Sequence, residues 1–262
     1  MRRAASRRRL IRGRAASAGR GYRGVVRALV VGNAGDADPG LVGERLEHLG
    51  FALSSVAREE PGQWPSLVGT DLVLLLGSDW SVYGDGVAKQ VRAEQELVRE
   101  SHRRGVPVLG ICFGAQLMAS ALGGAVSRAP RAEIGWCDVL APPAHAVVGG
   151  RWMQWHHDAF SVPPGADVLA LSDAGPQAMR INRCLGVQYH PEANEAIVTR
   201  WLSGEGAVEL AVSGLSPADL MEQTRTAMPA ATEASRALVE WFIDVVATGP
   251  AAPAPRRNLF TR

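Results

Sequence analysis

The sequence has three cysteines, a single lysine and no long apolar run, and each shortage excludes a class of protein. Three cysteines without a C-x-x-C pair cannot build a disulfide scaffold or a thiolate zinc cluster. The longest apolar run, at residues 72–76, is far shorter than the roughly 18 residues needed to cross a membrane. These absences predict a globular cytoplasmic protein with neither a metal site nor a membrane partner.

Positive charge is concentrated at one end of the chain. The sequence has 28 basic and 26 acidic residues, but residues 1–24 contain nine arginines and no acidic residue. The rest of the chain therefore has 19 basic and 26 acidic residues, a formal charge of about −7. Residues 1–24 lack the apolar stretch of a secretory signal, and we interpret them as a disordered leader or a start codon assigned too early. For the acidic remainder we expect no nucleic-acid partner.

From residue 25 onward, short apolar runs alternate with segments of helical period, which is typical of a parallel sheet covered by helices. Asp38 and Pro39 can begin a helix that Gly50 ends. Strands are expected at 25–31, 51–56, 71–76 and 106–111, and further helices at 87–104 and 113–122.

Beyond residue 125 the pattern predicts short strands at 137–140, 152–155, 168–171 and 185–189, and no helices between them. After residue 194 one helix begins at Ser216-Pro217, and a second contains Leu238, Trp241, Phe242 and Val245. We therefore predict an α/β sandwich with a mainly parallel central sheet at residues 25–203. A helical extension packed on it is expected at 204–248, and a flexible tail at 249–262.

The strongest local motif is Gly110-Ile111-Cys112-Phe113-Gly114, where a buried strand meets a helix. It has the arrangement of a nucleophile elbow with cysteine in the serine position. The glycines permit a sharp turn that exposes the thiol, and the helix N-terminus favours a negatively charged sulfur. Taken alone, the same motif also fits a buried structural cysteine beside a tight turn.

A second motif, His190-Pro191-Glu192, follows a later strand. Pro191 restricts His190 to an extended backbone, so the side chains of His190 and Glu192 point the same way. A cysteine nucleophile needs a base, and that base needs an acceptor to orient it. Although an ordinary pair at a strand end is the alternative, the two motifs together favour a triad of Cys112, His190 and Glu192.

With these motifs the sequence resembles the class I, or triad, glutamine amidotransferases, in particular the glutaminase domain of GMP synthetase and its free-standing relatives. The resemblance covers residues 25–202. It is carried by four ordered segments: Gly110-Ile111-Cys112-Phe113-Gly114-Ala115-Gln116, Glu133-Ile134-Gly135-Trp136, Gln154-Trp155-His156-His157-Asp158-Ala159-Phe160 and His190-Pro191-Glu192. It implies a flavodoxin-like, three-layer α/β fold.

The resemblance also implies a reaction and roles for individual residues. Cys112 would attack the side-chain amide of glutamine, release ammonia and form a γ-glutamyl thioester that water hydrolyses. His190 would move the proton and Glu192 would hold its ring. The oxyanion would be bound by the backbone N–H of Phe113 and by one from the loop at Gly77-Ser78.

This loop departs from the family pattern of glycine, glycine, proline, any residue and serine. It reads Gly77-Ser78-Asp79-Trp80-Ser81, so serine replaces a glycine and aspartate replaces the proline. A backbone donor remains available at Ser78, but its resting geometry and the local charge differ. One consequence would be a loop that closes only when a substrate or partner binds.

Further residues are candidates for the substrate pocket. Gln116 resembles the family position that contacts the amino-acid end of glutamine, although it can also hydrogen-bond a nearby loop. Trp155, His156 and His157 are expected to shape the pocket wall, since no third cluster with ligand spacing favours a metal. Gly77 is expected beside the substrate.

The leading hypothesis is a class I glutamine amidotransferase that hydrolyses glutamine and supplies ammonia to a separate synthase chain. Residues 203–262 are too few for a synthetase domain, and the chain has no GxxxxGK[ST] loop. One alternative is a γ-glutamyl hydrolase or peptidase that acts on γ-glutamyl amides, and another is a non-catalytic regulatory protein with the same fold. No cofactor is expected.

Overall fold

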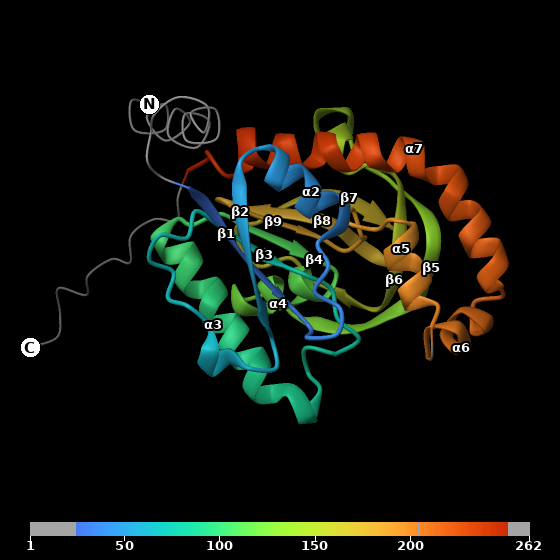
Figure 1. Ribbon diagram of the computed structural model, residues 1–262, viewed down its shortest axis with the longest axis horizontal. Helices are drawn as coiled ribbons and strands as arrows, with labels where there is room; N and C mark the ends of the chain where they lie inside the picture. The colour runs from blue at the N-terminus through green and yellow to red at the C-terminus, as the bar shows by residue number, and fades with distance from the viewer. Residues whose placement is uncertain (1–24, 204, 251–262) are drawn as a thin grey trace, which may run out of the picture.

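The computed structural model describes residues 25–203 and 205–250 (Figure 1). The predicted leader at 1–24 and residues 251–262 of the predicted tail lie outside the described residues. Nine strands are described, in chain order: β1 (Val26–Gly32), β2 (Phe51–Ala57), β3 (Leu72–Leu75), β4 (Val108–Ile111), β5 (Val126–Val139), β6 (Gly150–Phe160), β7 (Asp167–Ser172), β8 (Gly175–Ile181) and β9 (Cys184–Val187).

The main helices include three that alternate with the early strands and three that follow the last strand. They are α2 (Gly40–His48), α3 (Ala88–Arg104), α4 (Phe113–Ala121), α5 (Glu195–Trp201), α6 (Glu205–Val212) and α7 (Pro217–Trp241). Short 3₁₀ turns lie at η2 (Pro61–Gln63), η3 (Asp85–Val87) and η4 (Pro143–Val148), and a π-helical turn, η5 (Phe242–Val246), follows α7.

The central sheet has seven strands in the order β2-β1-β3-β4-β9-β8-β7. The first five are parallel, and β8 and β7 add an antiparallel edge. The carboxyl ends of the parallel strands therefore meet at one edge, which is where open α/β sheets bind ligands. Residues that directly follow β2, β3, β4 and β9 are brought together there.

Alternation along the strands divides the core into two layers. On β1, Val26, Ala28 and Val30 pack with residues of α2 and α7, whereas Leu29 and Val31 pack with residues of α3 and α4. Figure 1 shows α2 and α7 over one face of the sheet and α3 and α4 over the other. The predicted three-layer α/β sandwich with a mainly parallel sheet and C-terminal helices is confirmed.

The expectation of short strands after residue 125 is wrong in its details. Strands β5 and β6 are 14 and 11 residues long and form a separate antiparallel ribbon, with a register shift between Arg128 and Glu133. The exposed half of β5 is polar and contains Pro130, so it has no period-two apolar pattern. Strand β8 was missed for the same reason, because polar Gln177 lies among its buried residues.

Helix α7 replaces the two helices expected after Ser216. It continues through Pro229 to Trp241, and it bends along its length (Figure 1), as expected for a helix with proline in its interior. Ser216 caps its N-terminus: the hydroxyl accepts a hydrogen bond from Asp219 N at 3.1 Å, while the Asp219 carboxylate accepts one from Ser216 N at 3.3 Å. This reciprocal pair is a capping box.

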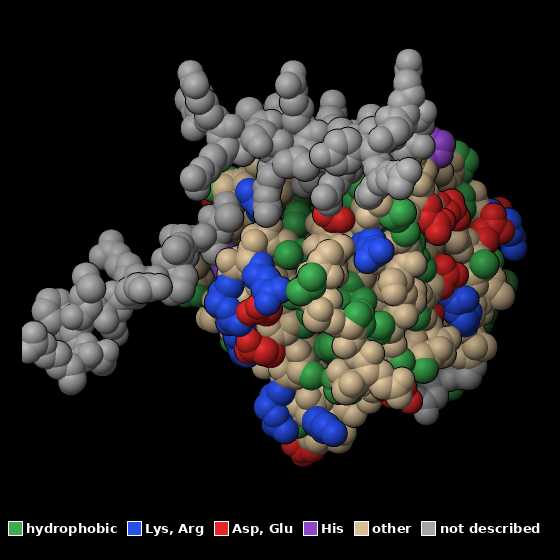
Figure 2. Space-filling view, turned by 60° about the vertical axis from the view of Figure 1, so that its left-hand side comes forward, with side chains coloured by type: hydrophobic (Ala, Val, Ile, Leu, Met, Phe, Trp, Pro, Cys, Tyr) green, Lys and Arg blue, Asp and Glu red, His purple; other side chains and the backbone are tan. Residues whose placement is uncertain are grey.

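In the part of the chain that the structure describes, no helix is both long enough and apolar enough to span a membrane. Acidic and basic side chains are intermingled on the face drawn in Figure 2. On α3 they form ion pairs one turn apart, such as Arg99 with Glu96 and Arg104 with Glu100. Both of these acidic residues are thus paired with arginines of the same helix.

We expect Ser216→Ala to lower the free energy of unfolding by about 1 kcal/mol, because the first turn of α7 loses its side-chain acceptor. Urea unfolding followed by circular dichroism measures the change. Thr226→Ala, at an exposed position inside the same helix, is the control and is expected not to reduce stability. Equal stability of the Ser216 variant and the wild type would contradict the capping role.

Candidate active site

Cys112 lies at the turn between β4 and α4 in a backbone conformation that side chains rarely adopt, with φ 49° and ψ −109°. Its N–H donates to Val187 O of the neighbouring strand, at 2.8 Å, and its carbonyl accepts from Ala115 and Gln116, each at 3.0 Å. Hydrogen bonds therefore hold the turn to β9 on one side and to the first turn of α4 on the other. Such strain, of about 1 to 3 kcal/mol, persists only where the surroundings enforce it.

The two glycines of the motif are required by packing. A Cβ on Gly110 would lie 2.7 Å from the carbonyl oxygen of Gly114, and one on Gly114 would lie 2.3 Å from that of Leu75. No side chain fits at these separations. The glycines thus let α4 start directly against β3 and β4, with Cys112 at the sheet edge.

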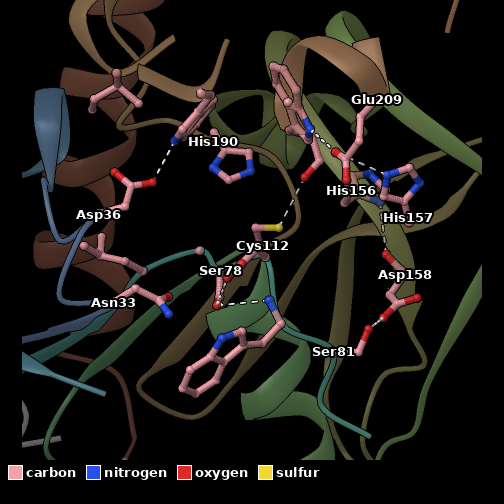
Figure 3. Close-up of a pocket in the computed structure, with 18 of the residues that line it drawn as sticks. Asn33, Asp36, Ser78, Ser81, Cys112, His156, His157, Asp158, His190 and Glu209 are labelled. Atoms are coloured by element: carbon pink, nitrogen blue, oxygen red, sulfur yellow. Dashed lines mark hydrogen bonds and ion pairs between the residues drawn. The ribbon is translucent and has the colours of Figure 1, made fainter. Parts of the chain in front are cut away.

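His190 and Glu192 lie beside Cys112, and Figure 3 shows the imidazole above the cysteine. His190 Nδ1 is 2.7 Å from Glu192 Oε1, and both side chains are buried. The ring is held between Gly77 and Trp201: a Cβ on Gly77 would lie 2.9 Å from His190 Cε1, and the Trp201 ring packs edge-on at 4.7 Å. The same Gly77 Cβ would lie 3.6 Å from Cys112 Cβ, so ring and cysteine approach one another across Gly77.

The environment sets the protonation of His190. Burial on its own lowers the pKa of the imidazole, but the charges of Glu192 and Cys112 outweigh burial and raise the pKa well above its usual range. Among the described residues, none meets hydrogen-bonding geometry with the buried Nε2, although Cys112 lies close enough to contribute to the raised pKa. The ring nitrogen opposite Glu192 is therefore free to exchange a proton with a reacting group.

The Gly77–Tyr83 loop follows β3, and its residues 77–81 line the same cavity as Cys112. Ser78 Oγ accepts from Trp80 N at 3.1 Å, and the loop is tied to β6 because Ser81 and Tyr83 both donate to the Asp158 carboxylate, at 2.7 and 2.8 Å. Among the described residues, only Cys112 and Asn182 have a positive φ outside glycine. Serine thus occupies the family's glycine position at Ser78 without a left-handed backbone.

The two expected oxyanion donors flank Cys112. The N–H of Phe113 is in the first turn of α4, where a helix provides no acceptor of its own. Ser78 follows Gly77 directly and lines the same cavity as Cys112.

The predicted substrate-binding residues Gly77, Gln116, Trp155, His156 and His157 line a cavity of about 680 Å³ together with Cys112 and His190. The side-chain amide of Gln116 donates to Asp158 O at 3.1 Å and to Gln188 Oε1 at 3.3 Å. Gln116 therefore hydrogen-bonds strand β6 and the residue that follows β9, while it remains in the cavity wall. Trp155 also places its backbone carbonyl 3.8 Å from Cys112 Sγ.

His156 belongs to a buried polar network on the β5–β6 ribbon. Its Nε2 is 3.1 Å from Glu133 Oε2, and its Nδ1 is 3.0 Å from Asp158 O. Burial opposes ionisation of Glu133, but hydrogen bonds from His156 and Ser172 outweigh it and lower the pKa of the carboxyl. This network fixes the wall in which His157 and Asp158 lie. Within residues 25–203 and 205–250, no group of three or more His, Cys, Asp or Glu side chains is placed to hold a metal ion.

Sequence reasoning missed several residues in or beside this site, among them Arg58, Glu94 and Trp201. Glu94 lies on the buried face of α3 with Val91 and Val98. A glutamate at a position where the helical period predicts an apolar residue could have indicated a buried charge. Arg58 directly follows β2, at the ligand-binding edge of the sheet. Nothing local distinguishes Trp201 from a core residue.

Comparison with known proteins identifies the family of this chain. The family model of class-I glutamine amidotransferases matches residues 42–197, and this chain belongs to that family. The predicted family and enzyme class are thereby confirmed. A glutamine amidotransferase from Thermotoga maritima has a similar structure, with a TM-score of 0.76 and 25% identity over 84% of this chain and 99% of that one.

Curated relatives include enzymes named GMP synthase (glutamine-hydrolyzing). That of Aeropyrum pernix is 35% identical over 166 residues, which are 58% of this chain and 31% of the relative. That of Mycobacterium tuberculosis is 38% identical over 171 residues, 59% of this chain and 31% of the relative. The chain thus spans about a third of the length of these relatives.

We expect Glu192→Gln to lower the pKa of His190, because the substitution removes the negative charge that raises it while the burial that lowers it remains. The pH dependence of the His190 Cε1–H shift, followed by NMR, measures the change. Glu133→Gln is the matched control, since it removes a buried carboxylate that contacts His156 instead of His190. An unchanged His190 titration in the Glu192 variant would show that Glu192 is not the source of the shift.

Proposed function

We propose that this protein hydrolyses glutamine to glutamate and ammonia, with Cys112 as nucleophile, His190 as proton carrier and Glu192 as its orienting partner. The observation that carries the proposal is the strained backbone of Cys112 beneath an imidazole whose buried Nε2 has no hydrogen-bond partner in the described part of the chain. Strain of this kind, which adds nothing to folding stability, is characteristic of functional sites. Membership of the glutamine amidotransferase family supports the choice of substrate.

The positions of these groups support the following sequence of steps. Cys112 Sγ attacks the side-chain carbonyl carbon of glutamine, and the N–H groups of Phe113 and Ser78 stabilise the negative charge that develops on oxygen. The protonated His190 gives its Nε2 proton to the departing nitrogen, so ammonia leaves and a γ-glutamyl thioester remains. His190 then takes a proton from water, whose oxygen attacks the thioester, and the sulfur is released with glutamate.

We further propose that the ammonia is consumed by a synthase on another chain. The named relatives are GMP synthases that hydrolyse glutamine, and this chain matches about 31% of their length. A synthase that retains the remaining functions would be the natural acceptor. Binding of such a partner beside the Gly77–Tyr83 loop would place it at the mouth of the cavity.

Cleavage of larger γ-glutamyl amides is a second candidate, favoured by the cavity. Its volume of about 680 Å³ is within the range of clefts that hold drug-sized ligands, so an amine larger than ammonia fits beside Cys112. The chemistry at sulfur would be the same. Only the leaving group would differ.

Cys112→Ala is expected to reduce kcat for glutamine by about 10⁴-fold or more, because no other group can form the thioester. Release of glutamate measures the rate, and mass spectrometry of acid-quenched wild type is expected to find a γ-glutamyl group on Cys112. Cys137→Ala is the control, since Cys137 lies on β5 away from the sulfur's partners. Wild-type activity in the Cys112 variant would refute the proposed function.

A panel of γ-glutamyl amides separates the two candidates. We expect kcat/KM to be highest for glutamine and to fall as the leaving amine grows, if ammonia is the product used. The γ-glutamyl alkylamides of increasing length are the test compounds, and glutamate release is the common readout. A higher kcat/KM for a substituted amide would replace the first candidate with the second.

A further inference from the structure

Arg58 and Glu94 form a charged pair with no solvent-exposed side-chain surface, next to the proposed active site. Arg58 follows β2, Glu94 lies on α3, and Arg58 Nε is 3.3 Å from Glu94 Oε2. Burial raises the pKa of Glu94, and the guanidinium opposes that shift. Burying two charges is costly, and replacing such pairs by apolar residues is often neutral or stabilising. Stability alone therefore does not explain this pair.

The guanidinium holds the backbone of the oxyanion loop. Nη1 donates to Gly77 O at 2.8 Å and to Asn33 Oδ1 at 2.9 Å, while Nη2 donates to Leu76 O at 2.9 Å. Two consecutive carbonyls are thus bound by one rigid group. Glu94 Oε1 accepts from Nη2 at 3.3 Å and keeps the fork in this orientation.

The Gly77 contact has a direct consequence for Ser78. The carbonyl of Gly77 and the N–H of Ser78 belong to one planar trans peptide, in which they point in opposite directions. Fastening the Gly77 oxygen to Arg58 therefore directs the Ser78 N–H away from Arg58. A rotated peptide would give up this charge-assisted hydrogen bond.

Arg58 also contacts the segment that carries the second donor. Its guanidinium carbon lies 4.6 Å from the centre of the Phe113 ring, a cation–π contact. Phe113 is the residue whose backbone N–H is the other proposed oxyanion donor. The buried Arg58 guanidinium thus contacts both segments that carry the proposed oxyanion donors.

We infer that Arg58, oriented by Glu94, is a positioning residue that sets the Gly77–Ser78 peptide and Phe113 so that their N–H groups converge on the substrate oxygen. The inference rests on the proposed function, because it concerns the oxyanion of that reaction. Neither side chain touches the substrate. Their effect is on the charge that develops in the transition state.

The test uses Arg58→Lys in the full-length protein. Lysine keeps the positive charge, but its single ammonium nitrogen cannot reproduce the rigid planar fork that spans Gly77 O, Leu76 O, Asn33 Oδ1 and Glu94. We expect kcat for glutamine to fall by about 10² to 10³-fold, as for loss of one oxyanion donor, with little change in KM. Alkylation of Cys112 by iodoacetamide, which forms no oxyanion, is expected to proceed at the wild-type rate.

Two further variants complete the experiment. Glu94→Gln keeps the shape and an acceptor for Arg58 but removes the charge, so we expect a smaller fall in kcat in the same direction; it carries the test if Arg58→Lys does not fold. Arg103→Lys, at an exposed position on α3, is the matched control and is expected to keep wild-type kcat. Circular dichroism checks folding throughout.

The outcomes separate this inference from the proposed function. An active wild type with unchanged kcat in folded Arg58→Lys or Glu94→Gln would overturn the inference alone. A parallel loss of kcat and of alkylation rate would also overturn it, because Arg58 would then support the whole site and not the oxyanion hole. A wild type that releases no glutamate would contradict the proposed function, and this inference with it.

Discussion

A Cβ on Gly114 would lie 2.3 Å from the carbonyl oxygen of Leu75, so α4 can begin where it does only because that side chain is absent. This close approach forces the chain through a positive φ at Cys112 and places the sulfur at the carboxyl edge of the sheet. It also directs the N–H groups of the first turn of α4 toward the same point. His190, the Gly77–Tyr83 loop and the cavity all lie around this turn.

Buried charged side chains hold other groups of the site in fixed orientations. Glu192 fixes the ring of His190, Arg58 fixes the loop carbonyls, and Glu133 fixes His156. In each case a charged group is removed from water and hydrogen-bonded to fixed partners, which costs stability but preserves a geometry that solvent would otherwise relax.

The C-terminal helices also contribute to the site. Trp201 of α5 packs against His190 and donates to Asp36 at 2.8 Å, and Glu209 of α6 accepts from Trp155 at 2.8 Å and lines the cavity. The extension expected from residue 204 therefore reaches the wall of the cavity. Its residue boundaries as a separate unit stay a prediction, as do the roles of the site residues.

The amino-acid sequence by itself determined the α/β class, the elbow at Cys112 and the pairing of His190 with Glu192. Each of these depends on residues within a few positions of one another, where spacing and backbone restriction act directly. Only the tertiary structure placed Arg58, Glu94 and Trp201 at the site, and only it extended β5 and β6 into a long ribbon. Those contacts join segments that are far apart in sequence. Strand order and packing determine them, and neither produces a local periodicity in the sequence from which they could be predicted.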